Sequence, residues 1–287
     1  MMNKLIYSSF IILECVLWGI GNTVTKVGLQ SIGPYACLTI RFFLSFLLFV
    51  FFFFPKLLNH WTDMKRCIPI SIATAAAFIL STLSLSLTSA TNAGLLMALS
   101  VMFTPPLSLF VYKTRLEKKS IVSVILVVIG VYLLCGIDNR VGFGIGEIMA
   151  LMSSFCLAVT LTFSAKFVCT VDPVVLSTVQ SGITAMISFV FAVRMEDLDT
   201  LYNVSISGWL AIAYLVVGCT LIAYLLQNTA LKHVSSVFVS IAFCTEPLFT
   251  ALSAYFILDE KLSGIGYMGA LFIIVGITVS SISKRTA

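Results

Sequence analysis

The sequence consists largely of apolar runs of about twenty residues, separated by short polar segments. About 20 apolar residues is the length that an α-helix needs to cross the hydrocarbon core of a bilayer. Ten such runs can be placed. The predicted spans are residues 5–25, 34–54, 68–88, 91–112, 120–137, 145–168, 173–193, 206–226, 234–257 and 262–282. The runs are continuous and not alternating, which favours helices over the strands of a membrane β-barrel.

The composition agrees with a chain whose solvent is lipid. Sixty per cent of the residues are hydrophobic and 10% are charged, with a mean hydropathy of +1.10, whereas a soluble domain has about 25% charged residues. Ten crossings leave short loops and no room for a separate soluble domain. We therefore expect an all-α membrane protein.

The Lys and Arg residues indicate how the chain lies in the membrane. If the N-terminus is cytoplasmic, twelve of them fall on the cytoplasmic side, four fall outside and Arg41 lies within a span. Because cytoplasmic loops of membrane proteins carry an excess of Lys and Arg, both termini are expected in the cytoplasm of an inner or plasma membrane. The net charge of +5 is then a topology signal and does not indicate nucleic-acid binding.

The two halves of the chain resemble each other. A shift of 146 residues aligns Ser89 with Ser235, Phe103-Thr104 with Phe249-Thr250, Phe110 with Phe256, Leu116 with Leu262, and Gly130 with Gly276. Shifts of 140 and 139 align Lys26 with Lys166 and Pro34 with Pro173. Each half holds five spans, and because five is odd the second half is expected to be inverted. We expect repeats at 1–140 and 141–287 in one compact domain, an organisation typical of secondary transporters with a midplane site at the repeat interface.

Ordered motifs in both halves are similar to those of one known family. They are Leu17-Trp18-Gly19 followed by Lys26, Pro34 followed by Arg41-Phe42, Thr88-Ser89-Ala90, Asp172-Pro173, and EPLFTALSAYFILDEKLS at residues 246–263. The whole chain resembles the EamA-type ten-helix members of the drug/metabolite transporter superfamily. The halves are not equivalent, because Val101 and Thr114 stand at the repeat positions of Pro247 and Glu260. The resemblance implies transport of a metabolite without naming it.

Two acidic residues lie deep within predicted spans. Glu14 is about nine residues into the first span, and Glu246 is about twelve residues into the ninth. A charge at the bilayer centre costs about 2.5–3.5 kcal/mol on insertion scales, so both should face the bundle interior or water. Glu14 could bind a cationic group or take up a proton. Glu246 could line the same cavity, or it could cap the helix break that the adjacent Pro247 creates.

Glu14 begins a polar and aromatic face on the first helix. Trp18, Asn22 and Thr25 follow it at i+4, i+8 and i+11, so the four side chains share one side of the helix. One interpretation is that this face lines a central cavity, in which Trp18 adds a cation–π surface. The alternative is that Glu14 forms a buried structural ion pair with Arg41 of the second helix.

Other residues are predicted to line the pathway, and three prolines are predicted to bend the helices around it. Ser100 is the repeat counterpart of Glu246, and Ser154 that of Glu14 at the 140 shift. Further pathway candidates are Asn92, Gln180, Tyr224, Gln227 and Asn228. Pro105, Pro106 and Pro247 should kink or locally break their helices, because proline removes a backbone donor and its ring clashes with the preceding turn.

Together these features predict a secondary transporter for a small metabolite, amino-acid-like, cationic or zwitterionic, or drug-like. It would work by alternating access, with proton coupling or exchange, as a monomer or homodimer. The eight scattered cysteines form no CxxC or Cys/His pattern, so no disulfide, metal or cofactor is predicted. The sequence has no phosphate-binding loop and no metalloprotease or nucleophile-elbow motif. An embedded enzyme or lipid-handling protein, or a non-transporting subunit, is therefore the less favoured alternative.

Overall fold

A computed structural model of the chain describes residues 2–113, 118–134, 144–259 and 264–281. Regular structure in these segments is entirely helical. Several residues named above lie outside the described segments: Thr114, Leu116, Glu260, Lys261, Leu262 and Ser263.

Thirteen α-helices make up most of the described chain. They are α1 Met2–Gly28, α2 Pro34–Asn59, α3 Trp61–Leu87, α4 Ala90–Ala98, α5 Ser100–Tyr112, α6 Lys118–Leu134, α7 Ile145–Phe167, α8 Pro173–Met195, α9 Ile206–Tyr214, α10 Ala223–Ala230, α11 Ser236–Phe243, α12 Glu246–Leu258 and α13 Gly264–Ser281. A 3-10 turn at Leu198–Asn203 precedes α9, and a π-helix at Leu215–Ile222 joins α9 to α10.

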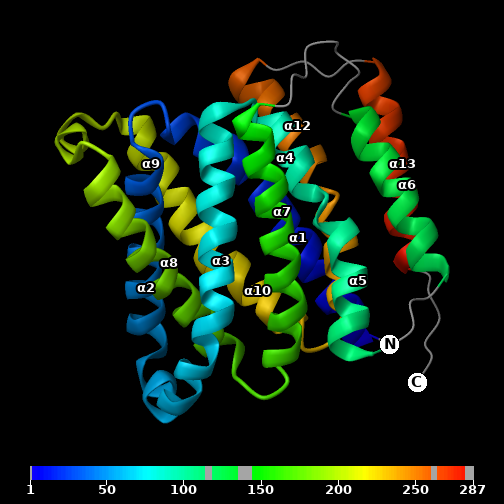
Figure 1. Cartoon of the computed structure of the whole chain (residues 1–287), viewed down its shortest axis with the longest axis horizontal. Helices are drawn as coiled ribbons and strands as arrows, with labels where there is room; N and C mark the ends of the chain where they lie inside the picture. The colour runs from blue at the N-terminus through cyan, green and yellow to red at the C-terminus, as the bar shows by residue number, and fades with distance from the viewer. Residues whose placement is uncertain (1, 114–117, 135–143, 260–263, 282–287) are drawn as a thin grey trace.

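Eight helical stretches in the described segments are long and apolar enough to cross a membrane. They are Ile6–Gly28, Pro34–Asn59, Trp61–Leu87, Ala90–Tyr112, Ile145–Phe167, Pro173–Met195, Ile206–Ala230 and Ser236–Leu258. The helices α6 and α13 hold shorter apolar stretches, Ile121–Gly130 and Gly264–Gly276. They pack against each other at one side of the bundle (Figure 1).

The helices form a bundle with two ends. We call the end where α1 begins and α2 meets α3 the lower end, and the end where α1 stops and α2 begins the upper end, as they lie in Figure 1. The helix α1 contacts α9, α10, α11 and α12, so it runs through the interior. Its residues are therefore placed to line any central site.

Two membrane-spanning helices are interrupted at corresponding positions. The first, α4–α5, breaks at Leu99, and the second, α11–α12, breaks at Cys244–Thr245. The two sites face each other, because the thiol of Cys244 donates a hydrogen bond to the carbonyl oxygen of Ala98 at 3.5 Å. Ala98 and Cys244 are 146 residues apart, the same shift that aligns the two halves of the sequence.

The ends of these interrupted helices also correspond. The Ser89 hydroxyl caps α4 and the Ser235 hydroxyl caps α11, each by accepting a hydrogen bond from a backbone N–H. Lys113 after α5 and Asp259 after α12 both adopt left-handed backbone conformations, with φ of 53° and 55°. Both pairs are again 146 residues apart.

The prolines lie close to these interruptions but not always at them. Pro247 is the second residue of α12, one residue after the break at Cys244–Thr245. Pro105 and Pro106 lie inside α5, and the break at Leu99 precedes them by more than a turn. The second helix continues through Pro55 with a non-helical residue at Phe53, so it is longer than the predicted span 34–54.

Polar contacts hold α2 and α8 together at both ends. At the lower end, Lys56 forms an ion pair with Asp172, with 2.9 Å between Nζ and Oδ2. At the upper end, the carboxylate of Glu196 accepts hydrogen bonds from the backbone N–H groups of Tyr35 and Ala36 at 2.7 and 2.8 Å. A carboxylate suits this position because the first N–H groups of a helix have no partner within the helix.

Candidate functional site

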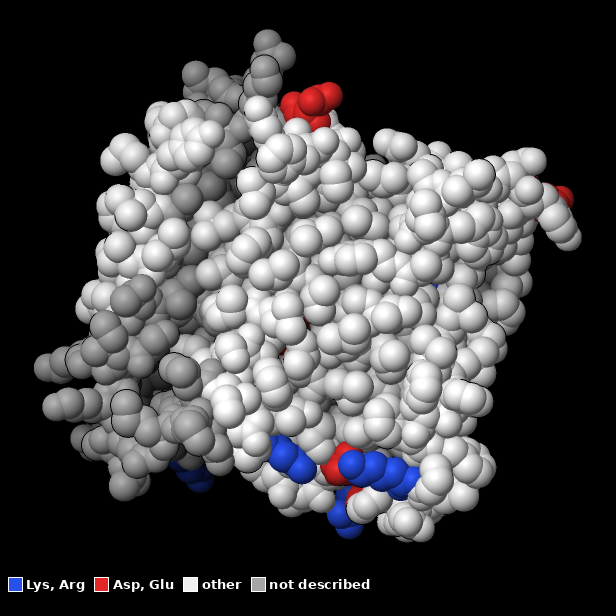
Figure 2. Space-filling model, turned by 180° about the vertical axis from the view of Figure 1, so that it is seen from behind, with Lys and Arg blue, Asp and Glu red and all other residues white. Residues whose placement is uncertain are grey.

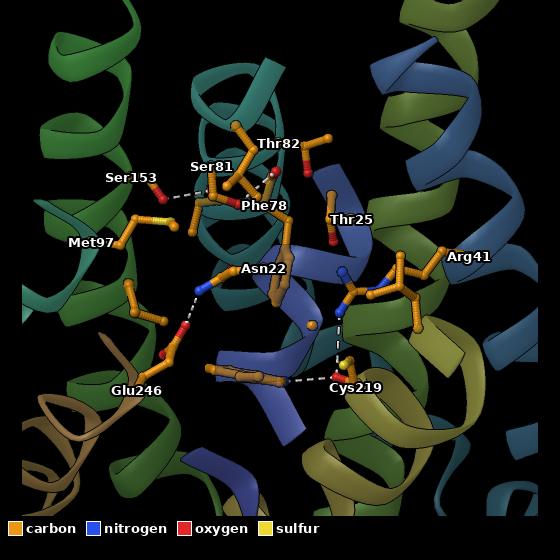
Figure 3. A pocket seen from close by; sticks show the side chains of 16 residues that line it. Asn22, Thr25, Arg41, Phe78, Ser81, Thr82, Met97, Ser153, Cys219 and Glu246 are labelled. Atoms are coloured by element: carbon orange, nitrogen blue, oxygen red, sulfur yellow. Dashed lines mark hydrogen bonds between the residues drawn. The ribbon is translucent and has the colours of Figure 1, made fainter. Parts of the chain in front are cut away.

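A cavity of about 60 Å³ lies inside the bundle, and α1, α2, α3, α12 and the π-helix all contribute to its wall. It extends from Trp18 and Glu246 towards Thr25, Thr82 and Leu85, in the upper parts of α1 and α3. Figure 3 shows Arg41 and Glu246 on opposite sides of this cavity, with Asn22 between them. Four of the predicted site residues therefore line one cavity: Trp18, Asn22, Arg41 and Glu246.

Asn22 connects α1 to the break in the α11–α12 helix. Its side-chain amide donates to Oε1 of Glu246 at 2.7 Å and to the hydroxyl of Thr250 at 3.2 Å. The helices can approach this closely because Gly19 has no side chain. A Cβ atom there would lie 2.5 Å from Cβ of Phe249 and 2.7 Å from the carbonyl oxygen of Glu246.

The π-helix supplies a backbone acceptor to the cavity wall. The indole N–H of Trp18 donates to the carbonyl oxygen of Cys219 at 2.8 Å, and Nη2 of Arg41 donates to the same oxygen at 3.3 Å (Figure 3). Short π-helical segments within α-helices are rare and frequently occur at functional sites. Here the segment fixes an aromatic and a cationic side chain at one carbonyl group.

A second hydrogen bond fixes the guanidinium of Arg41. Its Nε donates to the hydroxyl of Thr220 at 2.8 Å, and that hydroxyl donates to the carbonyl oxygen of Leu215 at 2.9 Å. The guanidinium carbon lies 5.0 and 5.1 Å from the ring centroids of Phe42 and Phe78. These contacts leave donors of the guanidinium free to bind an anionic group, because arginine has five N–H donors.

The ion pair between Glu14 and Arg41, the structural alternative considered for Glu14, is not formed. Glu14 is fully buried, and within the described part of the chain neither carboxylate oxygen has a hydrogen-bond partner. It lies one helical turn below Trp18, outside the wall of the cavity. A buried carboxyl group without a hydrogen-bond partner is costly, which distinguishes Glu14 from Glu246, whose carboxylate accepts from Asn22.

An aromatic layer closes the cavity towards the lower end. The Trp18 ring packs against Phe78 and Phe243 with centroid distances of 5.9 and 5.2 Å. Phe78 in turn lies 5.0 Å from Phe42 and 6.0 Å from Tyr224. Tyr224 and Gln227, two predicted pathway residues, line a separate and smaller cavity below this layer.

The two predicted serines lie outside the cavity wall. Ser154 donates its hydroxyl to the carbonyl oxygen of Leu151 at 2.7 Å, and the adjacent Ser153 lines the cavity instead. Ser100 is fully buried, with no partner for its hydroxyl among the described residues. An offset of one residue is enough to turn a helical side chain away from a cavity.

The α3 wall of the cavity was not predicted from the sequence. Phe78, Thr82 and Leu85 line it at spacings of four and three residues, the pattern that identified the polar face of the first helix. This spacing, applied to the third span, would have found them. No comparable sequence signal points to Cys219 or Thr220. Cys219 acts through its backbone carbonyl, and both residues lie in the apolar sequence of the π-helix.

Comparisons with known proteins identify the family of the chain and support its fold. The EamA-like transporter family model matches residues 5–136 and 144–282. A solved crystal structure has a TM-score of 0.78 and 17% identity, covering 96% of each chain, which shows a shared fold.

Curated relatives align over nearly the whole length. An "Uncharacterized transporter" of Archaeoglobus fulgidus is 28% identical over 94% of this chain and 84% of its own. A "Probable amino-acid metabolite efflux pump" of Escherichia coli is 25% identical, over 96% of this chain and 94% of its own. These relatives are named as transporters and not as enzymes. Since the family model covers most of the sequence, this multi-pass membrane protein belongs to the EamA-like transporter family.

Proposed function

We propose that the protein is a secondary active transporter that moves a small amino-acid-like zwitterion across the cytoplasmic membrane by alternating access. The observation that carries this proposal is the placement of Arg41 and Glu246 on opposite sides of one buried cavity. A guanidinium binds a carboxylate through paired hydrogen bonds. A carboxylate attracts an ammonium group, so the two walls together match both charges of a zwitterion.

The surroundings of these two groups support the same interpretation. Arg41 is held by Thr220 and by the Cys219 carbonyl, both uncharged, and Glu246 is held by the amide of Asn22. Neither charge is neutralised by an ion pair within the described segments. Buried charges are costly unless they are paired, and a zwitterionic substrate would pair both at once.

Ten membrane crossings arranged as two inverted repeats are part of the proposal. The helices α6 and α13 would add two crossings to the eight longer ones. The equivalent breaks, N-caps and left-handed C-caps at a spacing of 146 residues support the repeat. Exchange between outward- and inward-open states would then swap the conformations of the two halves, as in other inverted-repeat transporters.

The lower end of the bundle is proposed to face the cytoplasm. In Figure 2, all the prominent Lys and Arg groups lie at this end, together with some acidic residues, whereas the charged groups at the upper end are acidic. A broad, largely uncharged band separates the two ends. Basic residues at the lower ends of helices include Lys56, Lys65, Arg66, Lys113, Lys166 and Lys232. By the positive-inside rule this places the N-terminus in the cytoplasm.

Proton coupling is proposed to involve Glu14. Its carboxyl is buried one turn from Trp18 and has no partner among the described residues. A group in that position changes its charge only when the surrounding structure opens to water. Proton binding and release at Glu14 would therefore accompany the change between the two states.

The first experiment is transport in proteoliposomes with the purified protein and a panel of radiolabelled L-amino acids, measured in both directions. The relative named as an amino-acid metabolite efflux pump makes export the first direction to test. Thermal melting with the same panel gives an independent reading, because a ligand at 100 times its Kd stabilises the native state by about 2.7 kcal/mol. If no zwitterion is transported and none raises the melting temperature, the proposal fails.

A further inference from the structure

A second cavity lies directly below the aromatic layer. Its volume is about 10 Å³, close to the smallest space that holds one water molecule. Its polar lining comes from Thr74, Thr160, Gln180, Tyr224 and Gln227, and none of its lining residues carries a formal charge. We call this cavity the lower chamber.

Two polar atoms of the lower chamber have no partner in the part of the chain that the structure describes. They are the hydroxyl of Tyr224 and the side-chain oxygen Oε1 of Gln227, on residues that are 2% and 3% exposed. A buried polar group left without a hydrogen bond costs about 1–3 kcal/mol. Both residues line the chamber. A ligand there could therefore donate a hydrogen bond to Oε1 of Gln227, and could donate to or accept from the hydroxyl of Tyr224.

The neighbouring polar side chain of the chamber is already engaged. The amide of Gln180 donates to the hydroxyls of Thr74 and Ser164 at 3.1 and 3.4 Å, and its oxygen accepts from Asn228 at 3.0 Å. This network packs α3, α7, α8 and α10 together. The unused hydrogen-bonding capacity is therefore concentrated on Tyr224 and Gln227, which face the chamber from one helix.

The lower chamber and the upper cavity share a wall. Trp18, Ala77, Phe78 and Leu157 line both. Trp18 is fixed by its hydrogen bond to the Cys219 carbonyl, whereas the phenyl ring of Phe78 has no polar group to hold it. Phe78 also lies under the Arg41 guanidinium at 5.1 Å. A carboxylate bound by Arg41 would compete for this cation–π contact and loosen the ring.

We propose that the lower chamber is the side-chain subsite of the transporter and that it selects an uncharged side chain able to form hydrogen bonds. This inference rests on the proposed function, in which the charged groups of the zwitterion occupy the upper cavity. The side chain would enter as Phe78 rotates, and Tyr224 and Gln227 would bind its polar end. A charged side chain would lose its hydration without gaining an opposite charge, and an apolar one would leave both polar atoms unpaired.

Competition for L-[14C]glutamine transport in proteoliposomes tests the subsite without any variant. L-glutamine, L-methionine and L-glutamate have side chains of similar length that are respectively amide, apolar and anionic. We expect glutamine to compete at least about tenfold better than the other two, the equivalent of one buried hydrogen bond. If no amino acid is transported, the proposed function fails and the subsite with it. If all three compete equally, the subsite alone is wrong.

Two conservative variants then assign the selectivity to these residues. Tyr224→Phe and Gln227→Met each remove one unpaired polar atom and keep the side-chain volume nearly constant. We expect each to lower the glutamine-to-methionine ratio of kcat/KM about tenfold while methionine transport changes little. The exposed Gln30 at the upper end gives a matched control, Gln30→Met, whose ratio should equal the wild-type ratio. Unchanged ratios in both chamber variants would overturn the assignment.

Discussion

Asn22 donates a 2.7 Å hydrogen bond to the carboxylate of Glu246 and so connects α1 to the interruption between α11 and α12. The bond holds the acid in the cavity wall, opposite Arg41. It also joins the interior helix α1 to one of the two interrupted helices. Binding or release of a ligand at Glu246 would therefore act directly on the geometry of the break between α11 and α12.

Glu246→Gln is expected to impair transport of zwitterions without unfolding the protein. The glutamine oxygen can still accept from Asn22, but the negative charge that attracts an ammonium group is gone. We expect KM to rise at least about tenfold, equivalent to roughly 1.4 kcal/mol of lost binding. KM in proteoliposomes and the melting temperature measure the two effects. Asp199→Asn, at an exposed acid of the upper end, is the matched control. Wild-type KM in Glu246→Gln would remove this acid from the binding site.

Arg41→Lys is expected to weaken binding although the positive charge is kept. A lysine ammonium cannot reproduce the planar fork that now reaches both Thr220 and the Cys219 carbonyl. KM should rise about tenfold, with a smaller change in kcat, because a paired guanidinium–carboxylate contact is lost. The same exchange at the exposed Arg194 should have no effect. A lysine variant with wild-type KM would show that charge alone is recognised at this position.

Glu14→Gln is expected to abolish accumulation driven by a pH gradient. The amide cannot take up or release a proton, so the variant would retain at most exchange of labelled for unlabelled substrate. Its thermal stability should equal or exceed that of the wild type, because a neutral amide costs less to bury than a carboxylate. Parallel assays of gradient-driven uptake and of exchange separate these effects. Uptake by the variant that still follows the pH gradient would place the coupling group elsewhere.

Gly19→Ala is expected to destabilise the protein and impair transport together. The added methyl group would lie 2.5 Å from Cβ of Phe249 and 2.7 Å from the backbone oxygen of Glu246, so α1 and α12 would have to separate. Overpacking of this kind typically costs about 1–3 kcal/mol. Gly264→Ala is a suitable control, since nothing lies within 4 Å of its added Cβ. Equal melting temperatures for the two variants would contradict the close packing of α1 on α12.

Much of the helix layout could be predicted because apolar length and proline positions are local signals. The helices α2 and α8 begin at Pro34 and Pro173, as the sequence indicated. The third helix begins at Trp61, earlier than the predicted residue 68, because Pro69 and the polar residues before it are accommodated within the helix. The break at Leu99 could not be located from Pro105, since it coincides with the packing of Ala98 against Cys244 from the other half of the chain.

The site was predictable where it consists of polar side chains in apolar spans. Asn22, Arg41 and Glu246 stand out for that reason, and the structure places them around one cavity. The carbonyl of Cys219 did not stand out, because any residue can present a backbone oxygen. Its position depends on how the chain winds between α9 and α10, and an apolar sequence does not specify that winding.

The π-helix at Leu215–Ile222 has a consequence for how relatives of this protein could diverge. One residue turns an α-helix by about 100°. Deleting a single residue there would restore regular winding and rotate all of α10 by about that angle relative to α9. Tyr224 and Gln227 would leave the lower chamber together, and a different pair of side chains would replace them. A single codon lost or gained at this point could thus change which residues of α10 line the lower chamber without substituting any residue of that helix.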